Sequence, residues 1–314
     1  MRARSAAAAA AVIALVSLVA SLAACRGEGP ASRTADAAAK VGTVAAPLRD
    51  DFGDSVQPSA VSPRSRIVSL NPTTTEVLFA IGAGGRLVGR TRWDAWPDSA
   101  RLVPDLGDGL RPNVEAVLAT RPDLVVLYAS ADNRAAAERL HAAGVRTLAL
   151  KIDRIADFRR ALLLLGVATG ERSRAAAVGD SVAATLGRVR RSTAGLPRPK
   201  VFWHVWNSPL ITIGAGSYMT ELVEIAGGHN VYADLPDPSP TIAMEDLLHR
   251  DPDVVLAGPE GARLIAEGAA WRRLRAVRAG RVLVVDTALV GRPSVRLGEA
   301  ATAIARLLHP GTTP

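Results

Sequence analysis

The sequence predicts an α/β protein of two similar lobes, each built on a mostly parallel sheet. Two observations predict it. Short β-rich runs alternate with helical patterns from about Arg64 onward, which is typical of parallel strands connected by helices. The pattern Glu-x-x-Leu-x-x-x-Pro-Asp-x-Val also begins at Glu115 and again at Glu245, 130 residues later. The alternation indicates the fold class, and the repeat indicates two lobes.

A second, looser repeat supports the first and follows the same order along the chain. It consists of Thr75-Glu76 with Gly82, and Thr220-Glu221 with Gly227. Each lobe is therefore expected to hold a Thr-Glu helix ending near glycine, a helix with an acidic start, a Pro-Asp turn and an apolar strand. The turn has a local reason, because proline ends the helix before the strand begins.

Six apolar runs are predicted as buried strands: Ile67–Leu70, Leu124–Tyr128, Thr147–Leu150, Val201–Trp206, Val254–Ala257 and Val282–Val285. After the first run, Asn71 and Pro72 are expected to begin a helix, with Glu76 in its early turns.

A long helical segment separates the two repeats. Asp157–Leu165 is amphipathic, a break is expected within Gly166–Gly170, and Glu171–Thr193 continues as an alanine-rich helix. A helix of about 20 residues spans about 30 Å, which is enough to pass from one lobe to the other. The alternative is a surface helix within one lobe.

The predicted organisation has five parts: residues 1–24 as a lipoprotein signal peptide, 25–62 as a lipidated cysteine and disordered tether, 63–152 as the N-terminal lobe, 153–196 as the connecting helical segment, and 197–310 as the C-terminal lobe. The tether is rich in Ala, Ser, Pro, Gly and Asp, and such a composition buries too little apolar surface to fold.

The N-terminus predicts export and a membrane anchor. Arg2 and Arg4 precede an apolar run over 6–20, which is too short for a membrane span and fits a secretory signal. Leu-Ala-Ala-Cys25 then resembles the bacterial lipobox, and Cys25 is the only cysteine in the chain. We expect a lipoprotein facing the periplasm or the cell exterior; an ordinary signal peptide with a chance cysteine is the alternative.

Composition argues against nucleic-acid binding. Without its first 24 residues the chain falls from a net charge of +8 to +6, because that segment carries two arginines and no acidic residue. The remaining charges are scattered and form no stripe interleaved with aromatics. Attraction to anionic lipid or to an anionic ligand is one use of this charge, and a bias towards arginine codons is the other explanation.

No catalytic residue and no protein-held metal is expected. Gly82-Ala-Gly84 and Gly214-Ala-Gly216 complete no phosphate-binding motif, and Gly-x-Ser-x-Gly is absent. The five histidines include no two within five positions, so they lack the paired spacing of a zinc or iron site. The sequence favours a binding protein over an enzyme or a receptor for a bare metal ion.

Four motifs resemble the class III periplasmic-binding proteins of ABC importers, which carry cobalamin, ferric siderophores or haem. They are Arg66–Glu76, Pro122–Val126, Ala226–Asn230 and Arg292–Arg296. The resemblance runs from about Arg64 to Leu308, and its spacing is most similar to the cobalamin binders. It implies two Rossmann-like lobes joined by one backbone helix, a monomer, and permease and ATPase partners. The ligand would be a chelate that carries its own metal, with no resident cofactor.

The resemblance also places two glutamates at the permease. Glu115 and Glu245 match positions where the family presents one exposed carboxylate per lobe to arginines of the permease. Their equivalence in the repeat suits a partner with twofold pseudo-symmetry, and charge pairing of this kind orients an encounter. The alternative is a glutamate that merely favours a helix N-terminus.

Strand ends and the loops that follow them face the crevice in open α/β folds. Candidate ligand-binding residues include Tyr128 and Trp206 at strand ends, Trp93 in a loop after the second strand, and Thr73 near the N-terminus of the first helix. Arg292 is the fifth candidate. By resemblance, Trp93, Tyr128 and Arg292 match positions that line the cobalamin pocket. Aromatic faces suit a corrin, a porphyrin or an aromatic chelator, and an arginine suits carboxylate or phosphate groups. Thr73 is equally explained by helix capping.

Several alternatives remain open at this stage. Gly109 and Ser239 stand where the cobalamin binders carry tryptophan, so a ferric siderophore or haem remains an alternative to a corrinoid. Trp203 fits either the pocket or the core. His204 could ligate the metal of a bound chelate or pack in the core. A tethered sensory domain that binds the same ligand without transport is a further alternative.

Overall fold

The computed structural model describes residues 47–57 and 64–311. The predicted signal peptide and Cys25 lie outside these residues, so lipidation stays a prediction. Within the described ranges, no helix is both long and apolar enough to cross a membrane.

The N-terminal lobe is a parallel four-stranded sheet in the order β2-β1-β3-β4. Its strands are β1 (Ile67–Ser69), β2 (Leu87–Gly89), β3 (Leu124–Tyr128) and β4 (Arg146–Leu150). Its helices are α1 (Pro72–Ala80), α2 (Val114–Ala119) and α3 (Ala131–Ala142), with 3-10 turns at Gly84–Arg86 and Asp98–Leu102. As predicted, α1 begins at Pro72, and the Asn71 side chain accepts a hydrogen bond from the Thr73 backbone N–H.

The C-terminal lobe repeats this plan with the parallel order β10-β9-β5-β8. Its strands are β5 (Lys200–His204), β8 (His229–Asn230), β9 (Val254–Ala257) and β10 (Val282–Val284), with an antiparallel hairpin of β6 (Trp206–Asn207) and β7 (Leu210–Ile211). Its helices are α6 (Tyr218–Ile225), α7 (Met244–Arg250), α8 (Pro259–Glu267), α9 (Arg275–Arg278), α10 (Thr287–Val290) and α11 (Leu297–Leu308), with a 3-10 turn at Trp271–Arg273.

The predicted repeat is confirmed. Its Thr-Glu motifs lie on α1 and α6, its acidic helix starts on α2 and α7, and its apolar strands are β3 and β9. One strand prediction was too long, because β5 ends at His204 and Trp206 belongs to the hairpin. β8 was not predicted, since a strand of two residues carries too little pattern to detect.

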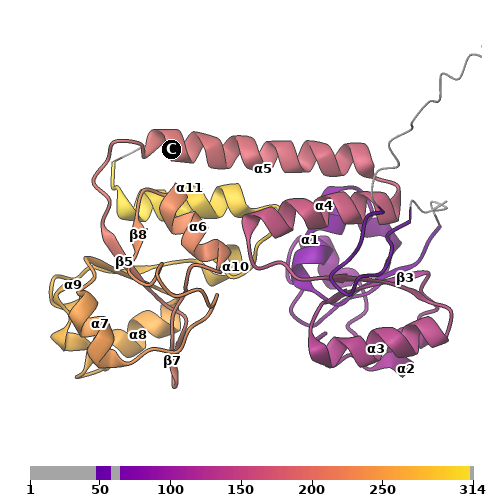
Figure 1. The fold of residues 1–314 in the computed structure, drawn as a ribbon, viewed down its shortest axis with the longest axis horizontal. Coiled ribbons are helices and arrows are strands. Elements are labelled where there is room, and N and C mark those ends of the chain that lie inside the picture. The colour runs from indigo at the N-terminus through magenta and orange to yellow at the C-terminus, as the bar shows by residue number, and fades with distance from the viewer. Residues whose placement is uncertain (1–46, 58–63, 312–314) are drawn as a thin grey trace, which may run out of the picture. The chain divides into compact units, whose positions relative to one another are not determined.

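The connecting segment consists of α4 (Ile155–Thr169) and α5 (Arg172–Ser192). α5 packs against α1 of the N-terminal lobe and against α6 and α11 of the C-terminal lobe, so it joins the two (Figure 1). The helix breaks at Gly170, where φ is +77°, and not at Gly166. Gly166 instead allows close packing, because a Cβ there would lie 2.7 Å from that of Ala175.

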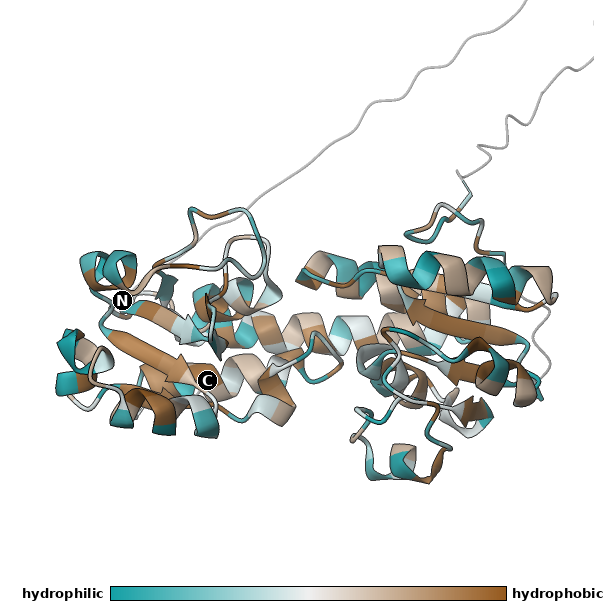
Figure 2. Ribbon diagram, turned by 90° about the horizontal axis from the view of Figure 1, so that it is seen from below, coloured by the Kyte–Doolittle hydropathy of each residue, from teal (hydrophilic) through white to brown (hydrophobic). Residues whose placement is uncertain are grey.

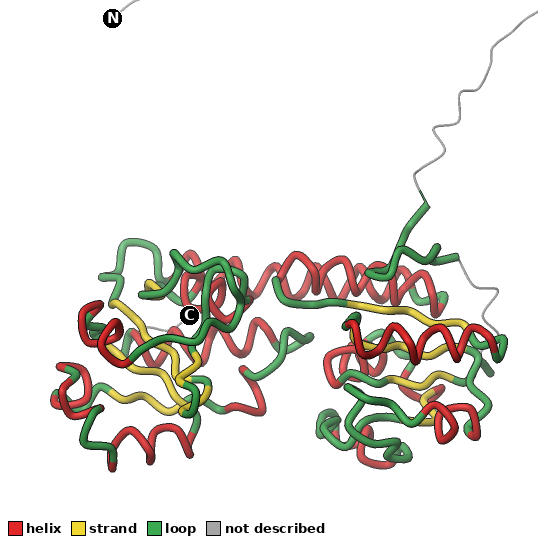
Figure 3. The backbone as a smooth tube through the Cα atoms, turned by 60° about the horizontal axis from the view of Figure 1, so that its bottom comes forward, coloured by secondary structure: helices red, strands yellow, loops and turns green. Residues whose placement is uncertain are grey.

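Helices cover both faces of each sheet, as Figure 3 shows. Because side chains alternate along a strand, β3 directs Leu124 and Val126 to one face and Val125 and Leu127 to the other. The first face belongs to an apolar cluster that runs through α4, α5, α6 and α11 and includes strands of both sheets. Separate clusters lie beneath the opposite faces, and the strands are correspondingly apolar in Figure 2.

The tether prediction was wrong over residues 47–57, which pack on the edge strand β4. The Ala149 backbone N–H donates to Asp50 Oδ2 at 2.8 Å, and the Lys151 N–H donates to Asp51 Oδ2 at 2.7 Å. The backbone N–H of Asp51 in turn donates to the Ala149 carbonyl at 2.9 Å. Hydrogen bonds to a charged group stabilise by about 1.5–3 kcal/mol each, which offsets the polar composition of this segment. The N-terminal lobe therefore begins well before residue 63.

Candidate functional site

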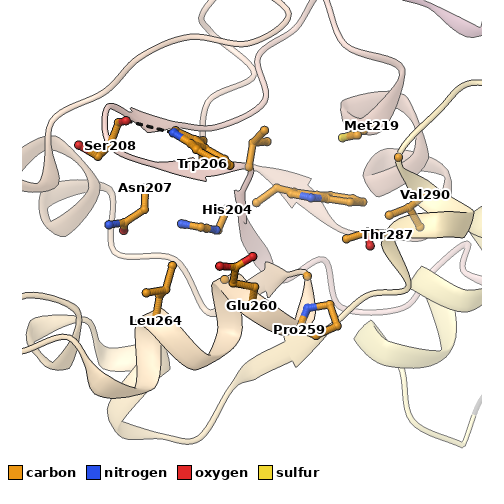
Figure 4. A pocket seen from close by; sticks show the side chains of 15 residues that line it. His204, Trp206, Asn207, Ser208, Met219, Pro259, Glu260, Leu264, Thr287 and Val290 are labelled. Carbon is orange, nitrogen blue, oxygen red and sulfur yellow. Dashed lines mark hydrogen bonds between the residues drawn. The ribbon is translucent and has the colours of Figure 1, made fainter. Parts of the chain in front are cut away.

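A cavity of about 600 Å³ lies where β5, β9 and β10 end in the C-terminal lobe. Ligands of open α/β sheets bind outside the carboxyl ends of the strands. The lining comes from β5, the hairpin and the helices α6, α8 and α10: Trp203, His204, Val205, Trp206, Asn207, Ser208, Met219, Gly258, Pro259, Glu260, Gly261, Leu264, Thr287, Val290 and Gly291. Figure 4 shows His204, Trp206 and Glu260 around this cavity.

Trp206 is the predicted ligand residue that lines the cavity. Its side chain is 60% exposed, and its indole N–H donates to the Ser208 carbonyl at 3.0 Å. That bond fixes the ring in the hairpin while leaving one face open. Trp203 is buried in the apolar cluster that joins the lobes and also lines the cavity. It therefore belongs both to the core and to the pocket.

His204 is 6% exposed, and its ring lies edge-on to Trp271 with 5.6 Å between centroids. Its Nε2 is buried and has no partner among the described residues. Burial lowers the pKa of His204 and favours the neutral ring. Because Nε2 is enclosed, this geometry fits a packed core histidine better than a metal ligand. Gly261 makes room for the ring, since a Cβ there would lie 2.5 Å from His204 Nδ1.

On the N-terminal lobe, Trp93 is 58% exposed in the loop after β2. The buried carboxylate of Asp94 holds this loop. It accepts hydrogen bonds from Thr75 Oγ1 at 2.8 Å, Thr91 Oγ1 at 2.8 Å and the Thr91 N–H at 3.0 Å. Burial raises the pKa of Asp94 despite these bonds. The threonine of the Thr-Glu motif therefore anchors the loop that presents Trp93.

Tyr128 is the last residue of β3 and Thr73 lies in the first turn of α1, and the two take different roles. The Tyr128 hydroxyl donates to Asp153 Oδ1 at 3.3 Å. Burial and the nearby Asp153 carboxylate raise the pKa of Tyr128 to about 12, so the phenol stays protonated at neutral pH. Thr73 is buried in the first turn of α1, where Asn71 and not Thr73 supplies the cap.

Arg292 precedes α11 in the C-terminal lobe and reaches the N-terminal lobe. Its Nη1 lies 3.3 Å from the Trp93 carbonyl oxygen, to which it donates, and 3.5 Å from Glu76 Oε1. Four residues later, the Arg296 guanidinium lies 5.3 Å from the centroid of the Trp96 ring. The structure thus brings together two of the predicted ligand residues, Arg292 and Trp93.

The five predicted ligand residues do not share one cavity. Trp206 lines the C-terminal cavity, Arg292 follows its last lining residue, and Trp93, Tyr128 and Thr73 lie on the other lobe. Sequence reasoning missed Asn207, Glu260 and Thr287 in the lining. The run Gly258-Pro259-Glu260-Gly261 was a usable signal, because it follows a buried strand and begins a helix.

Both candidate docking glutamates are exposed in the first turns of short helices, α2 and α7. The interaction of the Glu115 carboxylate with its own backbone N–H, followed by its ion pair with Arg139, lowers the pKa of Glu115. Glu245 has no ion pair among the described residues. Within the same ranges, no group of three or more His, Cys, Asp or Glu side chains could hold a metal ion.

Comparison with known proteins decides the family. A family model described as periplasmic binding protein matches residues 67–289. The chain belongs to the periplasmic binding protein family. It is 29% identical to a cobalamin-binding protein of Halobacterium salinarum, over 78% of this chain and 69% of the relative. It is 27% identical to an uncharacterised ABC transporter substrate-binding lipoprotein of Bacillus subtilis, over 88% and 90%.

Among solved structures, this periplasmic binding protein resembles a periplasmic haem-binding protein of Pseudomonas aeruginosa. The TM-score is 0.72 at 25% identity, with 80% of this chain and 94% of the other covered. Two lobes of parallel sheets joined by a helix are therefore the architecture expected of the family.

The buried Glu76 gives this periplasmic binding protein a testable pH dependence. Burial raises the pKa of Glu76 above its ordinary value of 4.5. Ser294, Arg292 and Arg296 favour the charged carboxylate and lower the pKa, but the effect of burial is larger, and the nearby Asp94 carboxylate adds to the rise. The folded protein therefore holds this proton to higher pH than the unfolded chain. The stability from that proton is fully present below pH 4.5 and is lost as the pH rises through the folded pKa.

The Glu76→Gln variant does not titrate at this position, so it is expected to gain stability relative to wild type as the pH rises. The difference in Tm between variant and wild type, measured by calorimetry from pH 4 to 8, should widen with pH. A difference that stays constant or narrows would contradict the buried-carboxylate assignment.

Proposed function

We propose that this chain is the substrate-binding lipoprotein of an ABC importer and that it captures a metal chelate, with a corrinoid favoured, for delivery to the permease. One observation carries the proposal. Each lobe carries an exposed tryptophan, Trp206 at the C-terminal cavity and Trp93 on the N-terminal lobe, and the cationic Arg292 contacts the Trp93 carbonyl. Flat aromatic faces with one cation suit a planar metal macrocycle that bears acidic groups.

The named relatives support this ligand class. The Halobacterium relative is named for cobalamin, and the Pseudomonas structure for haem. Gly109 and Ser239, which stand where the cobalamin binders carry tryptophan, bear on the choice between a corrinoid and haem. At Gly109, φ is +80° and a Cβ would lie 2.4 Å from the Leu70 carbonyl oxygen, so the backbone excludes a side chain there. This chain therefore offers less aromatic surface to a ligand than the cobalamin binders do, and a ferric siderophore and haem are the alternatives to a corrinoid.

Titration with cyanocobalamin, followed by calorimetry, tests the ligand. We expect saturable one-to-one binding, and we expect Trp93→Ala and Trp206→Ala each to weaken it by about tenfold, since an aromatic contact is worth about 1 kcal/mol or more. Leu102→Ala, which truncates an exposed side chain in the turn at Asp98–Leu102, is the matched control and should bind like wild type.

If cyanocobalamin does not bind, haemin and a ferric siderophore are the next ligands in the same assay. Binding of either one, with the same loss in the tryptophan variants, would replace the corrinoid by that chelate. No binding of all three would contradict the chelate proposal.

Docking to the permease is part of the proposal. Glu115→Arg and Glu245→Arg should each reduce ligand-dependent stimulation of the transporter ATPase, and the double variant should abolish it, with ligand affinity unchanged. Glu138→Arg, on the exposed face of α3, should have little effect. Equal loss in all three single variants would show that net charge, and not these two carboxylates, governs docking.

The lipid anchor at Cys25 is also a proposal. The Bacillus relative is named a lipoprotein, which supports it. Cell fractionation tests it: wild type should follow the membranes, and Cys25→Ser should be released into the soluble fraction. A wild-type protein found only in the soluble fraction would contradict the anchor.

A further inference from the structure

Glu76 is an acidic residue in a place where an apolar one would be expected. It lies on α1 beside Val77 and Leu78 and is 1% exposed. Burying a carboxylate is unfavourable unless partners compensate. Here Oε1 lies 3.5 Å from Arg292 Nη1 and the Ser294 side chain also interacts with the carboxylate, but Oε2 has no hydrogen-bond partner among the described residues. The raised pKa of Glu76 agrees that the folded state disfavours its charge. Folding alone therefore does not explain this residue.

The equivalent glutamate in the other lobe is a useful contrast. Glu221 also reaches beyond its own lobe, to the start of α4 in the connecting segment, where Oε1 lies 2.9 Å from Arg154 Nη2 and Oε2 accepts the Ile155 backbone N–H at 2.7 Å. Both of its oxygens are satisfied, and it caps the N-terminus of α4. Glu221 thus has a structural role, whereas Glu76 contacts the residues that precede α11 and leaves one oxygen unpartnered.

The contact with Glu76 determines how Arg292 is presented. Nη1 alone is engaged, by the Glu76 carboxylate and the Trp93 carbonyl. Nε and Nη2 make no hydrogen bond to a described residue, and 21% of the side chain is exposed beside the exposed Trp93. A guanidinium held by one nitrogen keeps the other edge, Nε and Nη2, for a bidentate carboxylate or phosphate.

We propose that Glu76 is a positioning residue that orients Arg292, across the lobes, towards a carboxylate or phosphate group of the bound ligand. The ligand half of this inference rests on the proposed function, and the orientation of Arg292 does not. An unpositioned arginine would lose rotamer freedom on binding, so prior orientation lowers the entropic cost of capturing the anion.

The orientation is tested without ligand by ¹⁵N–¹H spectra of the arginine side chains in the full chain, with Arg292→Lys assigning the Arg292 signals. A guanidinium fixed at Nη1 rotates slowly and gives resolved Nη signals. We expect Glu76→Gln to collapse or broaden these signals and Glu221→Gln, the matched variant of the other lobe, to leave them unchanged while lowering Tm. Arg292 signals that are the same in wild type and Glu76→Gln would overturn the proposal.

The consequence for binding is tested with cyanocobalamin, which carries a phosphate, and with haemin, which carries carboxylates. Glu76→Gln should weaken binding by about tenfold, the scale of a hydrogen bond to a charged group, although it is no less stable at neutral pH. Adding Glu76→Gln to Arg292→Gln should cause no further loss. Additive losses, or unchanged affinity in Glu76→Gln, would refute the link to ligand. If wild type binds neither of these probes nor a ferric siderophore, the proposed function fails, and the spectra still decide the orientation of Arg292.

Discussion

The structure depends on one apolar layer that both lobes share. Helices α4, α5, α6 and α11 contribute to a single buried cluster that also takes side chains from β1, β3, β5 and β9. Each sheet covers this layer with one face and buries its other face in a cluster of its own. Because the layer is continuous, neither sheet can rotate without disturbing the packing of α5. The positions of the loops at the strand ends are restricted in the same way.

The polar contacts that tie the C-terminal lobe to the rest of the described chain differ in strength. On one side, Glu221 caps α4 with both carboxylate oxygens satisfied, and the Tyr218 N–H donates to the Asp153 carbonyl at 2.7 Å. On the other side, the contact from Glu76 Oε1 to Arg292 is longer, at 3.5 Å, and Glu76 Oε2 has no hydrogen-bond partner among the described residues. Stability is thus concentrated at one junction, and the weaker junction lies beside the exposed Trp93. The proposed role of Arg292 in ligand binding fits this division, because its guanidinium is only partly engaged beforehand.

Much of the fold could be predicted from the sequence, because its signals are local. β3 and β9 are buried apolar runs bounded by Pro-Asp turns, and α1 begins at an Asn-Pro pair, so their limits follow from neighbouring residues. β8 could not be predicted, because its two residues form a strand only by pairing with β5, which is distant in the sequence. Residues 47–57 were assigned to the tether because composition does not reveal the backbone contacts of Asp50 to β4. The site was harder still. The contact between Glu76 and Arg292 joins residues 216 apart, which no local pattern encodes.

The central claim is that a metal chelate lies between the C-terminal cavity and Trp93, with an acidic group against Arg292. Crystals grown with cyanocobalamin and measured on both sides of the cobalt absorption edge test it most directly, because the anomalous signal locates the metal independently of the protein. We predict one cobalt site between Trp206 and Trp93, with the ligand phosphate at Arg292 Nε and Nη2. A cobalt site away from both tryptophans, or a ligand whose phosphate avoids Arg292, would contradict it.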